Sequence, residues 1–171
     1  MVILGIDPGS RATGLGLVRV LGNRLSYLES EVVRPPAGEL SARLAHIYRH
    51  LETRLGDWKP DRVAIEAVFS HRNPRSALQL GQARGAALAA CGAVGLECSE
   101  YPPTRVKQAV AGTGAAGKSQ VQAMVSRLLG LGTPPPTDAA DALAVAICHG
   151  QFAAAPGADR VARALAREAA R

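Results

Sequence analysis

The 171-residue sequence predicts a single α/β domain. Two short apolar runs, at 1–7 and 61–68, have the length and composition of buried strands. Longer segments with apolar residues at helical spacing lie between and after these runs. The composition agrees, because 47% hydrophobic and 20% charged residues are typical of a globular protein with a sizeable core.

The N-terminal part of the chain favours three strands connected in sequence. Residues 1–7 are almost continuously apolar and end in an acid, as expected of a buried central strand. Pro8–Gly9 then indicate a turn, and residues 14–20 and 24–34 have the pattern of two further strands. This opening therefore predicts a three-stranded meander.

The rest of the chain alternates between the two kinds of element. Residues 39–56 have leucine and isoleucine at helical spacing after a break at Pro35–Pro36. Residues 61–68 form the second apolar strand and include the acid Glu66. The remaining predicted elements are a helix at 76–94, a strand at 96–102, a short helix at 105–110, and helices at 118–129 and 137–149.

Charge and cysteine usage restrict the class of protein. The net charge of +6 favours a polyanionic partner, with nucleic acid first, although a basic surface without a special partner fits equally well. Cys91, Cys98 and Cys148 are odd in number and lack C-x-x-C spacing, which argues against a disulfide framework and a zinc site. We expect free thiols in a cytoplasmic protein. No signal peptide or membrane-spanning run is recognised, and no membrane association is expected.

The segment GTGAAGKS, residues 112–119, fits the P-loop pattern G-x-x-x-x-G-K-[ST]. A P-loop follows a buried strand, but the residues before this segment have helical spacing. A downstream strand ending in an acid for magnesium is also missing from the pattern. We therefore expect no ATP binding here and interpret the segment as a loop before a helix, whose neighbouring lysines, Lys107 and Lys118, can meet phosphate.

Four acids occupy positions of particular interest. Asp7 and Glu66 lie where a buried strand would otherwise have apolar residues, although a turn cap and an edge position are the simpler explanations. Asp138 and Asp141 are three residues apart and share one face of the last helix, where capping alone would explain Asp138.

Convergence of these acids would have a large electrostatic cost. At about 4 Å and an effective dielectric of 20, each pair of like charges costs roughly 4 kcal/mol. Several such pairs would exceed the net stability of a typical domain, about 5–15 kcal/mol. Protonation or a hard cation such as Mg²⁺ or Mn²⁺ would relieve the repulsion. Two such ions form a phosphodiester-cleaving centre, in which one activates water and the other stabilises the leaving oxygen.

Five segments distributed over residues 3–149 have a more specific similarity: GIDPGSRATGLG, AIEAVF, SALQLGQARG, VKQAVAGTGAAGKSQVQ and TDAADALAVAICH. With these segments the chain resembles the RuvC family of bacterial Holliday-junction resolvases. The resemblance implies a ribonuclease-H-like fold, a five-stranded mixed β-sheet flanked by α-helices on both sides. This nuclease domain would occupy residues 1–152. A basic tail at 153–171 would follow, either as a helical stripe or as a disordered end.

The resemblance also implies an activity. A homodimer would nick two opposed strands of a four-way DNA junction in homologous recombination and DNA repair, in partnership with the RuvAB branch-migration complex. Cutting would leave 5′-phosphate and 3′-hydroxyl ends. Two Mg²⁺ ions per active site, with Mn²⁺ as a substitute, would be held by the residues that match the four metal-binding acids of the family, which are Asp7, Glu66, Asp138 and Asp141.

Further residues match, or lie near, functional positions of the family. Lys107 and Lys118 match its lysines near the scissile phosphate, and Phe69 matches an aromatic residue that contacts junction bases. Arg72 and Arg75 belong to a basic loop that could follow a DNA arm, with a solvated loop as the alternative.

Three glycines raise two separate questions. Gly117 stands where many relatives have a larger or charged residue, which leaves the placement of the following lysine open. The helix at 76–94 is the candidate dimer interface, because Gly81 and Gly85 share one of its faces. Packing of that face on the sheet of the same chain is the alternative.

Three other classes compete with this interpretation. An actin-like or sugar-kinase-like ATPase shares the GIDPGSRATGLG pattern but usually needs a second half, for which this chain is too short. A DNA-binding module without activity would not need four acids at these places. Another ribonuclease-H-like nuclease, acting on RNA–DNA hybrids, is disfavoured by the lysine-bearing loop, though only through the resemblance.

Overall fold

The computed structural model describes residues 1–67 and 74–153. In this part of the chain, every strand and helix predicted from the sequence is present. The elements in order are β1 (Val2–Asp7), β2 (Thr13–Leu21), β3 (Arg24–Val33), α1 (Leu40–Trp58), β4 (Arg62–Glu66), α2 (Pro74–Ala93), β5 (Cys98–Tyr101), α3 (Pro103–Ala111), α4 (Lys118–Leu129) and α5 (Thr137–Ala153).

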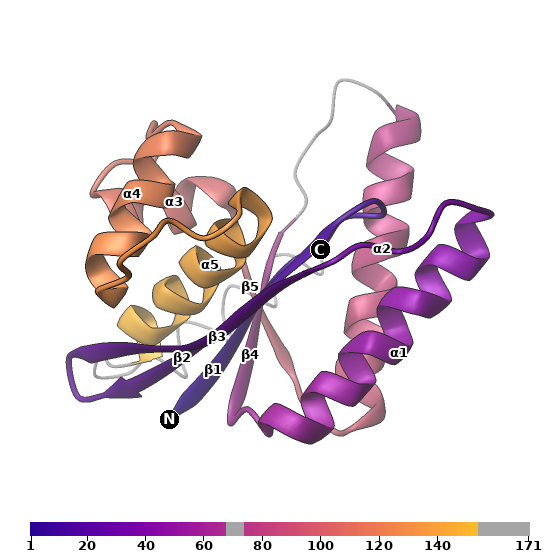
Figure 1. The fold of residues 1–171 in the computed structure, drawn as a ribbon, viewed down its shortest axis with the longest axis horizontal. Coiled ribbons are helices and arrows are strands. Elements are labelled where there is room, and N and C mark those ends of the chain that lie inside the picture. The colour runs from indigo at the N-terminus through magenta and orange to yellow at the C-terminus, as the bar shows by residue number, and fades with distance from the viewer. Residues whose placement is uncertain (68–73, 154–171) are drawn as a thin grey trace, which may run out of the picture.

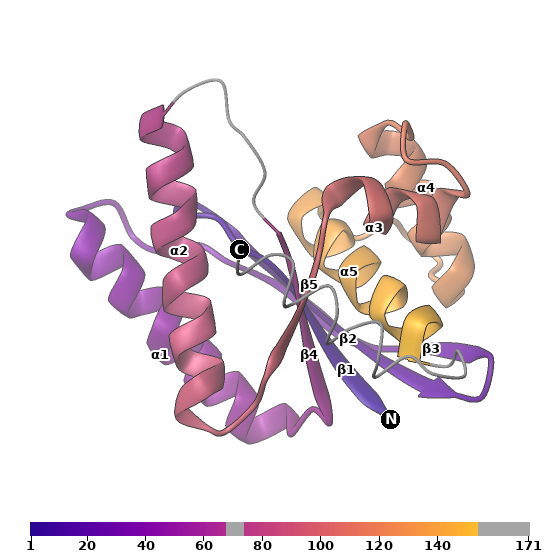
Figure 2. The same cartoon turned by 180° about the vertical axis from the view of Figure 1, so that it is seen from behind.

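The strands form one mixed five-stranded sheet in the order β3-β2-β1-β4-β5. β1, β2 and β3 are antiparallel neighbours, which confirms the predicted meander. β4 lies parallel to β1 on its other side, and β5 lies parallel to β4. Helices α1 and α2 cover one face of the sheet and α3, α4 and α5 cover the other (Figures 1 and 2). The arrangement of a mixed sheet between two helical layers is therefore confirmed.

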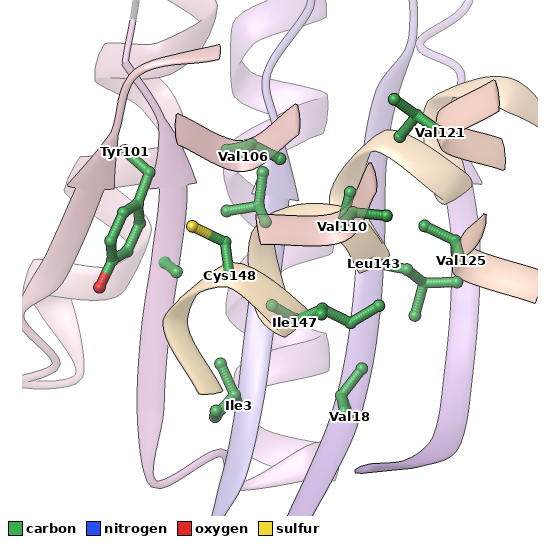
Figure 3. Close-up of a cluster of buried hydrophobic side chains, with 14 of the residues drawn as sticks. Ile3, Val18, Tyr101, Val106, Val110, Val121, Val125, Leu143, Ile147 and Cys148 are labelled. Carbon is green, nitrogen blue, oxygen red and sulfur yellow. The ribbon is translucent and has the colours of Figure 1, made fainter. Parts of the chain in front are cut away.

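Each face of the sheet has its own hydrophobic core. On the face of α1 and α2, buried strand side chains such as Leu4 and Ile6 pack with Ile47 and Leu51 of α1. On the opposite face, Ile3 and Val18 pack against α5, and α3 and α4 close this core from outside (Figure 3). Alternation along β1 explains the two sets, because successive side chains of a strand point to opposite faces.

Helix α5 lies unusually close to the strands beneath it. Gly5 of β1 and Gly16 of β2 are directly opposite each other in the ladder. A Cβ atom on Gly5 would stand 2.0 Å from the carbonyl oxygen of Ala142, and one on Gly16 would stand 2.7 Å from the amide nitrogen of Leu143. The helix backbone therefore rests on the strand backbone, and only glycine leaves room for this contact. The purpose of these glycines was not predicted from the sequence.

Two further observations concern the cysteines and the helices. Cys91, Cys98 and Cys148 are free thiols, as predicted from their number and spacing. Across residues 1–67 and 74–153, none of the helices combines the length and the apolar character needed to cross a membrane.

Candidate active site

Asp7 and Glu66 lie at the same end of the sheet. β1 and β4 are parallel neighbours, and Ile6 is the register partner of Ile65. Asp7 and Glu66 each follow that pair by one residue and are the last residues of their strands. Because the carboxyl ends of parallel strands meet at one edge, the two acids are adjacent.

Helix α5 brings the other two acids to this edge. Asp138 lies in the first turn of α5 and Asp141 lies three residues later, on the same face. Gly14, the register partner of Asp7, sits beneath this turn, since a Cβ atom there would be 1.9 Å from the carbonyl oxygen of Asp138. The same close glycine contact that seats the helix therefore sets the height of both acids above the end of β1.

The acids influence one another electrostatically. Burial, together with the charges of Glu66, Asp141 and Asp138, raises the pKa of Asp7 to about 8, against a lowering by Lys118. Burial is also the main reason that the pKa of Glu66 is raised, with the charge of Asp141 adding to it. The pKa of Asp141 is raised by burial and by Asp138. The sequence-predicted acids thus form one coupled cluster.

In the part of the chain that the structure describes, three cations border this cluster. The Lys118 Nζ atom lies 3.9 Å from Oδ2 of Asp141, and the lysine side chain is 80% exposed. Lys107 on α3 is half-buried, and its charge offsets part of the rise in the pKa of both Glu66 and Asp141. The third cation, Arg34, was not singled out from the sequence. It follows β3 directly, and a guanidinium nitrogen lies 3.6 Å from Oδ2 of Asp138.

The donor set suits a hard divalent cation. All four groups are carboxylates, and burial together with the neighbouring acids raises the pKa of Asp7, an unfavourable state of the carboxylate that a bound cation would relieve. Within the described ranges, however, no three His, Cys, Asp or Glu side chains are placed closely enough to hold a metal ion as they stand. The acids share one electrostatic environment without forming a closed set of ligands, and two of them face a basic side chain instead.

The P-loop-like segment lies between two helices. Gly112 ends α3 in a left-handed conformation with φ of 76°, and its N–H donates to the carbonyl of Gln108. The strand that a P-loop requires before its first glycine is replaced by a helix, as the spacing predicted. Gly117 has an ordinary extended backbone with open space around it, so a larger residue would fit there without strain. Lys118 is the first residue of α4 and is positioned by that helix.

The remaining candidate positions are distributed differently. Phe69 and Arg72 fall in 68–73, outside the described residues. Arg75 is exposed in the first turn of α2. Among the described residues, a Cβ atom placed on Gly81 or Gly85 would meet no atom within 4 Å apart from the backbone of α2 itself, and Leu78 on the same helix is 64% exposed. These glycines therefore do not serve packing on the sheet of their own chain.

This strand order, with acids at the ends of two central parallel strands and on the helix that covers them, is that of a ribonuclease-H-like nuclease. The family model described as "Crossover junction endodeoxyribonuclease RuvC" matches residues 3–149. Since this match spans most of the 171 residues, the chain belongs to the RuvC family.

Individual relatives are similar in sequence over most or all of the chain. The crossover junction endodeoxyribonuclease RuvC of Marinobacter nauticus is 53% identical over 148 residues, which cover 86% of this chain and 85% of the relative. The RuvC of Burkholderia vietnamiensis is 49% identical over 172 residues, covering 100% and 96% of the two chains.

Solved structures agree as well. A structure of Thermus thermophilus RuvC in complex with Holliday junction substrate superposes with a TM-score of 0.85 at 39% identity, covering 90% of this chain and 95% of that one. The yeast mitochondrial Holliday junction resolvase Ydc2 has a TM-score of 0.64 at 12% identity, covering 85% and 77%, and shows the shared fold alone.

Proposed function

We propose that the chain is a structure-selective endonuclease that resolves four-way Holliday junctions by paired, symmetric cuts in recombination and repair. Membership of the RuvC family and the structural likeness to a RuvC bound to junction DNA support this function. The observation on which it chiefly depends is the cluster of four coupled acids, bordered by lysines, at one end of the sheet.

In this proposal the four acids hold Mg²⁺, two ions per active site, with Mn²⁺ as a substitute. When bound, such ions activate water for in-line attack on the phosphodiester and stabilise the leaving oxygen. Of the four acids, Asp7 should couple metal binding to proton release most strongly. Because its pKa is raised to about 8, its carboxyl is mostly protonated at pH 7 in the metal-free chain, and binding of a cation releases that proton.

The lysines act on the DNA. Lys118 is exposed and lies beside Asp141, so its ammonium group can reach a phosphate held over the acids. Lys107 is half-buried on α3 and provides a second positive charge on the same cluster. We assign both lysines to stabilisation of the charge that develops on the scissile phosphate.

The proposed assembly is a homodimer. Two symmetric cuts require two active sites related by a two-fold axis, which a symmetric dimer provides. The exposed face of α2 with Leu78, Gly81 and Gly85 is the proposed interface, because no other described element of the chain approaches the two glycines closely. Phe69, Arg72 and Arg75 near the start of α2 are proposed DNA contacts.

The wider setting follows from the same function. A junction-cutting dimer would act with the RuvAB branch-migration complex, which supplies its substrate. We place it in the cytoplasm, an assignment that the three free thiols favour.

The decisive experiment is a cleavage assay. A labelled four-way junction and a linear duplex of matching sequence are incubated with the protein in Mg²⁺ or Mn²⁺, and then in EDTA. Paired, symmetric, metal-dependent nicks in the junction alone are expected, and Asp7→Asn should bind the junction without cutting it. Binding without cutting under either metal would favour a DNA-binding module. Absence of any junction preference would contradict the proposal.

A further inference from the structure

Arg34 lies at the edge of the sheet where the acids meet. Asp7, Gly14 and Val32 are consecutive register partners across β1, β2 and β3 and form a row at that end of the sheet. Arg34 comes two residues after Val32, where β3 has ended. Its position is therefore set by the same ladder that positions Asp7.

The ion pair of Arg34 with Asp138 is loose and accessible. The nitrogen–oxygen distance is 3.6 Å, and the two side chains are 62% and 38% exposed. Pairs with this exposure contribute little to folding stability, because water screens the charges and two long side chains lose freedom. Arg34 can therefore exchange this partner for another anion at small cost.

The acids of α5 are each paired with a cation from a different element. Asp138 faces Arg34, which follows β3, and Asp141 faces Lys118, which begins α4. A DNA strand lying over the two acids would thus meet a basic side chain from each of two separate parts of the fold. Of the two, the planar guanidinium of Arg34 is better suited to a bidentate contact with phosphate oxygens.

A divalent ion bound at Asp138 would weaken the ion pair between Asp138 and Arg34. An ion bound to this carboxylate repels a guanidinium that lies 3.6 Å from the same group, while a nearby DNA phosphate attracts it. We propose that Arg34 is a DNA-binding residue of the active-site rim, which pairs with Asp138 in the free chain and transfers to a backbone phosphate when metal and DNA bind. This inference rests on the function proposed above.

Arg24 offers a matched control. It is the first residue of β3, exposed at the opposite end of the same strand, so Arg24→Ala removes the same charge far from the acids. Binding of a fluorescent four-way junction is followed between about 50 and 200 mM salt by wild type, Arg34→Ala, Arg34→Lys and Arg24→Ala. Ca²⁺ replaces Mg²⁺, and the DNA is checked on a denaturing gel to be intact.

Loss of one phosphate contact lowers the slope of log affinity against log salt concentration by about 0.9. We expect this change for Arg34→Ala, with affinity about fivefold to tenfold lower at about 100 mM salt. Arg34→Lys should recover much of the slope, and Arg24→Ala should keep the slope of wild type. If wild type prefers the junction but Arg34→Ala and Arg24→Ala have the same salt slope and affinity, this inference is overturned and the proposed function stands. A wild type without junction preference would overturn the proposed function and the inference with it.

Calorimetric titration with Mn²⁺ in the absence of DNA tests whether a metal ion displaces Arg34 from Asp138. Since Arg34 and the ion compete for Asp138, Arg34→Ala should bind Mn²⁺ as tightly as wild type or more tightly. Weaker binding would mean that Arg34 orients Asp138 toward the metal, and the proposed exchange would then be wrong.

Discussion

Asp7→Asn is expected to stabilise the metal-free protein. Burial and the neighbouring acids raise the pKa of Asp7 from 3.8 to about 8 in the folded chain. At pH 7 the unfolded carboxyl is ionised, because the pH is about three units above its pKa, whereas the folded one is still mostly protonated. At about 1.4 kcal/mol per pH unit, this difference opposes folding by on the order of 4 kcal/mol, which a neutral asparagine avoids.

The sign of the pH dependence follows from the same pKa. Between about pH 4 and pH 8 the folded chain binds more protons at Asp7 than the unfolded chain does, so the contribution of Asp7 to wild-type stability falls as pH rises through this window. The variant lacks this contribution. The two proteins should therefore differ most near pH 8 and become similar toward pH 4.

Urea unfolding in EDTA measures the effect directly. Glu52→Gln, on the exposed side of α1, removes one negative charge outside the cluster and should leave the free energy of unfolding nearly unchanged. Mg²⁺ should then stabilise wild type and add little to Asp7→Asn. Equal free energies of unfolding for wild type and Asp7→Asn at pH 7 would refute the view that burial and the neighbouring acids make the ionised form of Asp7 unfavourable.

Three further predictions follow from the site and the core. Lys118→Ala should lower the single-turnover cutting rate about 10²-fold or more with a smaller change in junction affinity; an unchanged rate would remove the lysine from the chemistry. Gly14→Ala should destabilise the protein by about 1–3 kcal/mol in urea unfolding, because its Cβ would overlap the first turn of α5, whereas Gly56→Ala on open α1 surface should not. Burial lowers the pKa of His149, so the contribution of His149 to stability should fall as pH drops below about 6.5. Wild type should therefore lose stability relative to His149→Gln in this range, and an unchanged difference between the two proteins would exclude the effect.

Local patterns in the sequence were sufficient for the elements and for part of the site. The apolar runs and the helical spacing predicted each strand and helix within a few residues, because periodicity depends only on neighbours along the chain. Asp7 and Glu66 stood out as acids at the ends of apolar runs. That the strands form one five-stranded mixed sheet, by contrast, came from the family resemblance. The order of the strands in that sheet was not predicted, since no local pattern shows which strands become neighbours.

The features that sequence reasoning missed depend on distant partners. Gly5 and Gly16 are explained by a helix that begins about 120 residues later in the chain. Arg34 is one of many arginines, and its distinction is the closeness of Asp138, which no local pattern encodes. The close approach of α5 had one signal in the sequence, the two glycines of GLG at residues 14–16. Glycines within an otherwise apolar strand indicate that another backbone approaches closely.

The backbone contact between α5 and the glycines of the sheet also has a mechanical consequence. Elsewhere in the core, layers of side chains separate helix from strand, and rotamer changes there can absorb a small displacement. Beneath the first turns of α5 no such layer of side chains is present, because the backbones of helix and sheet meet directly. A displacement of the first turns of α5 would therefore act directly on the hydrogen-bonded strands, and this backbone contact fixes the spacing of Asp138 and Asp141 from the end of β1.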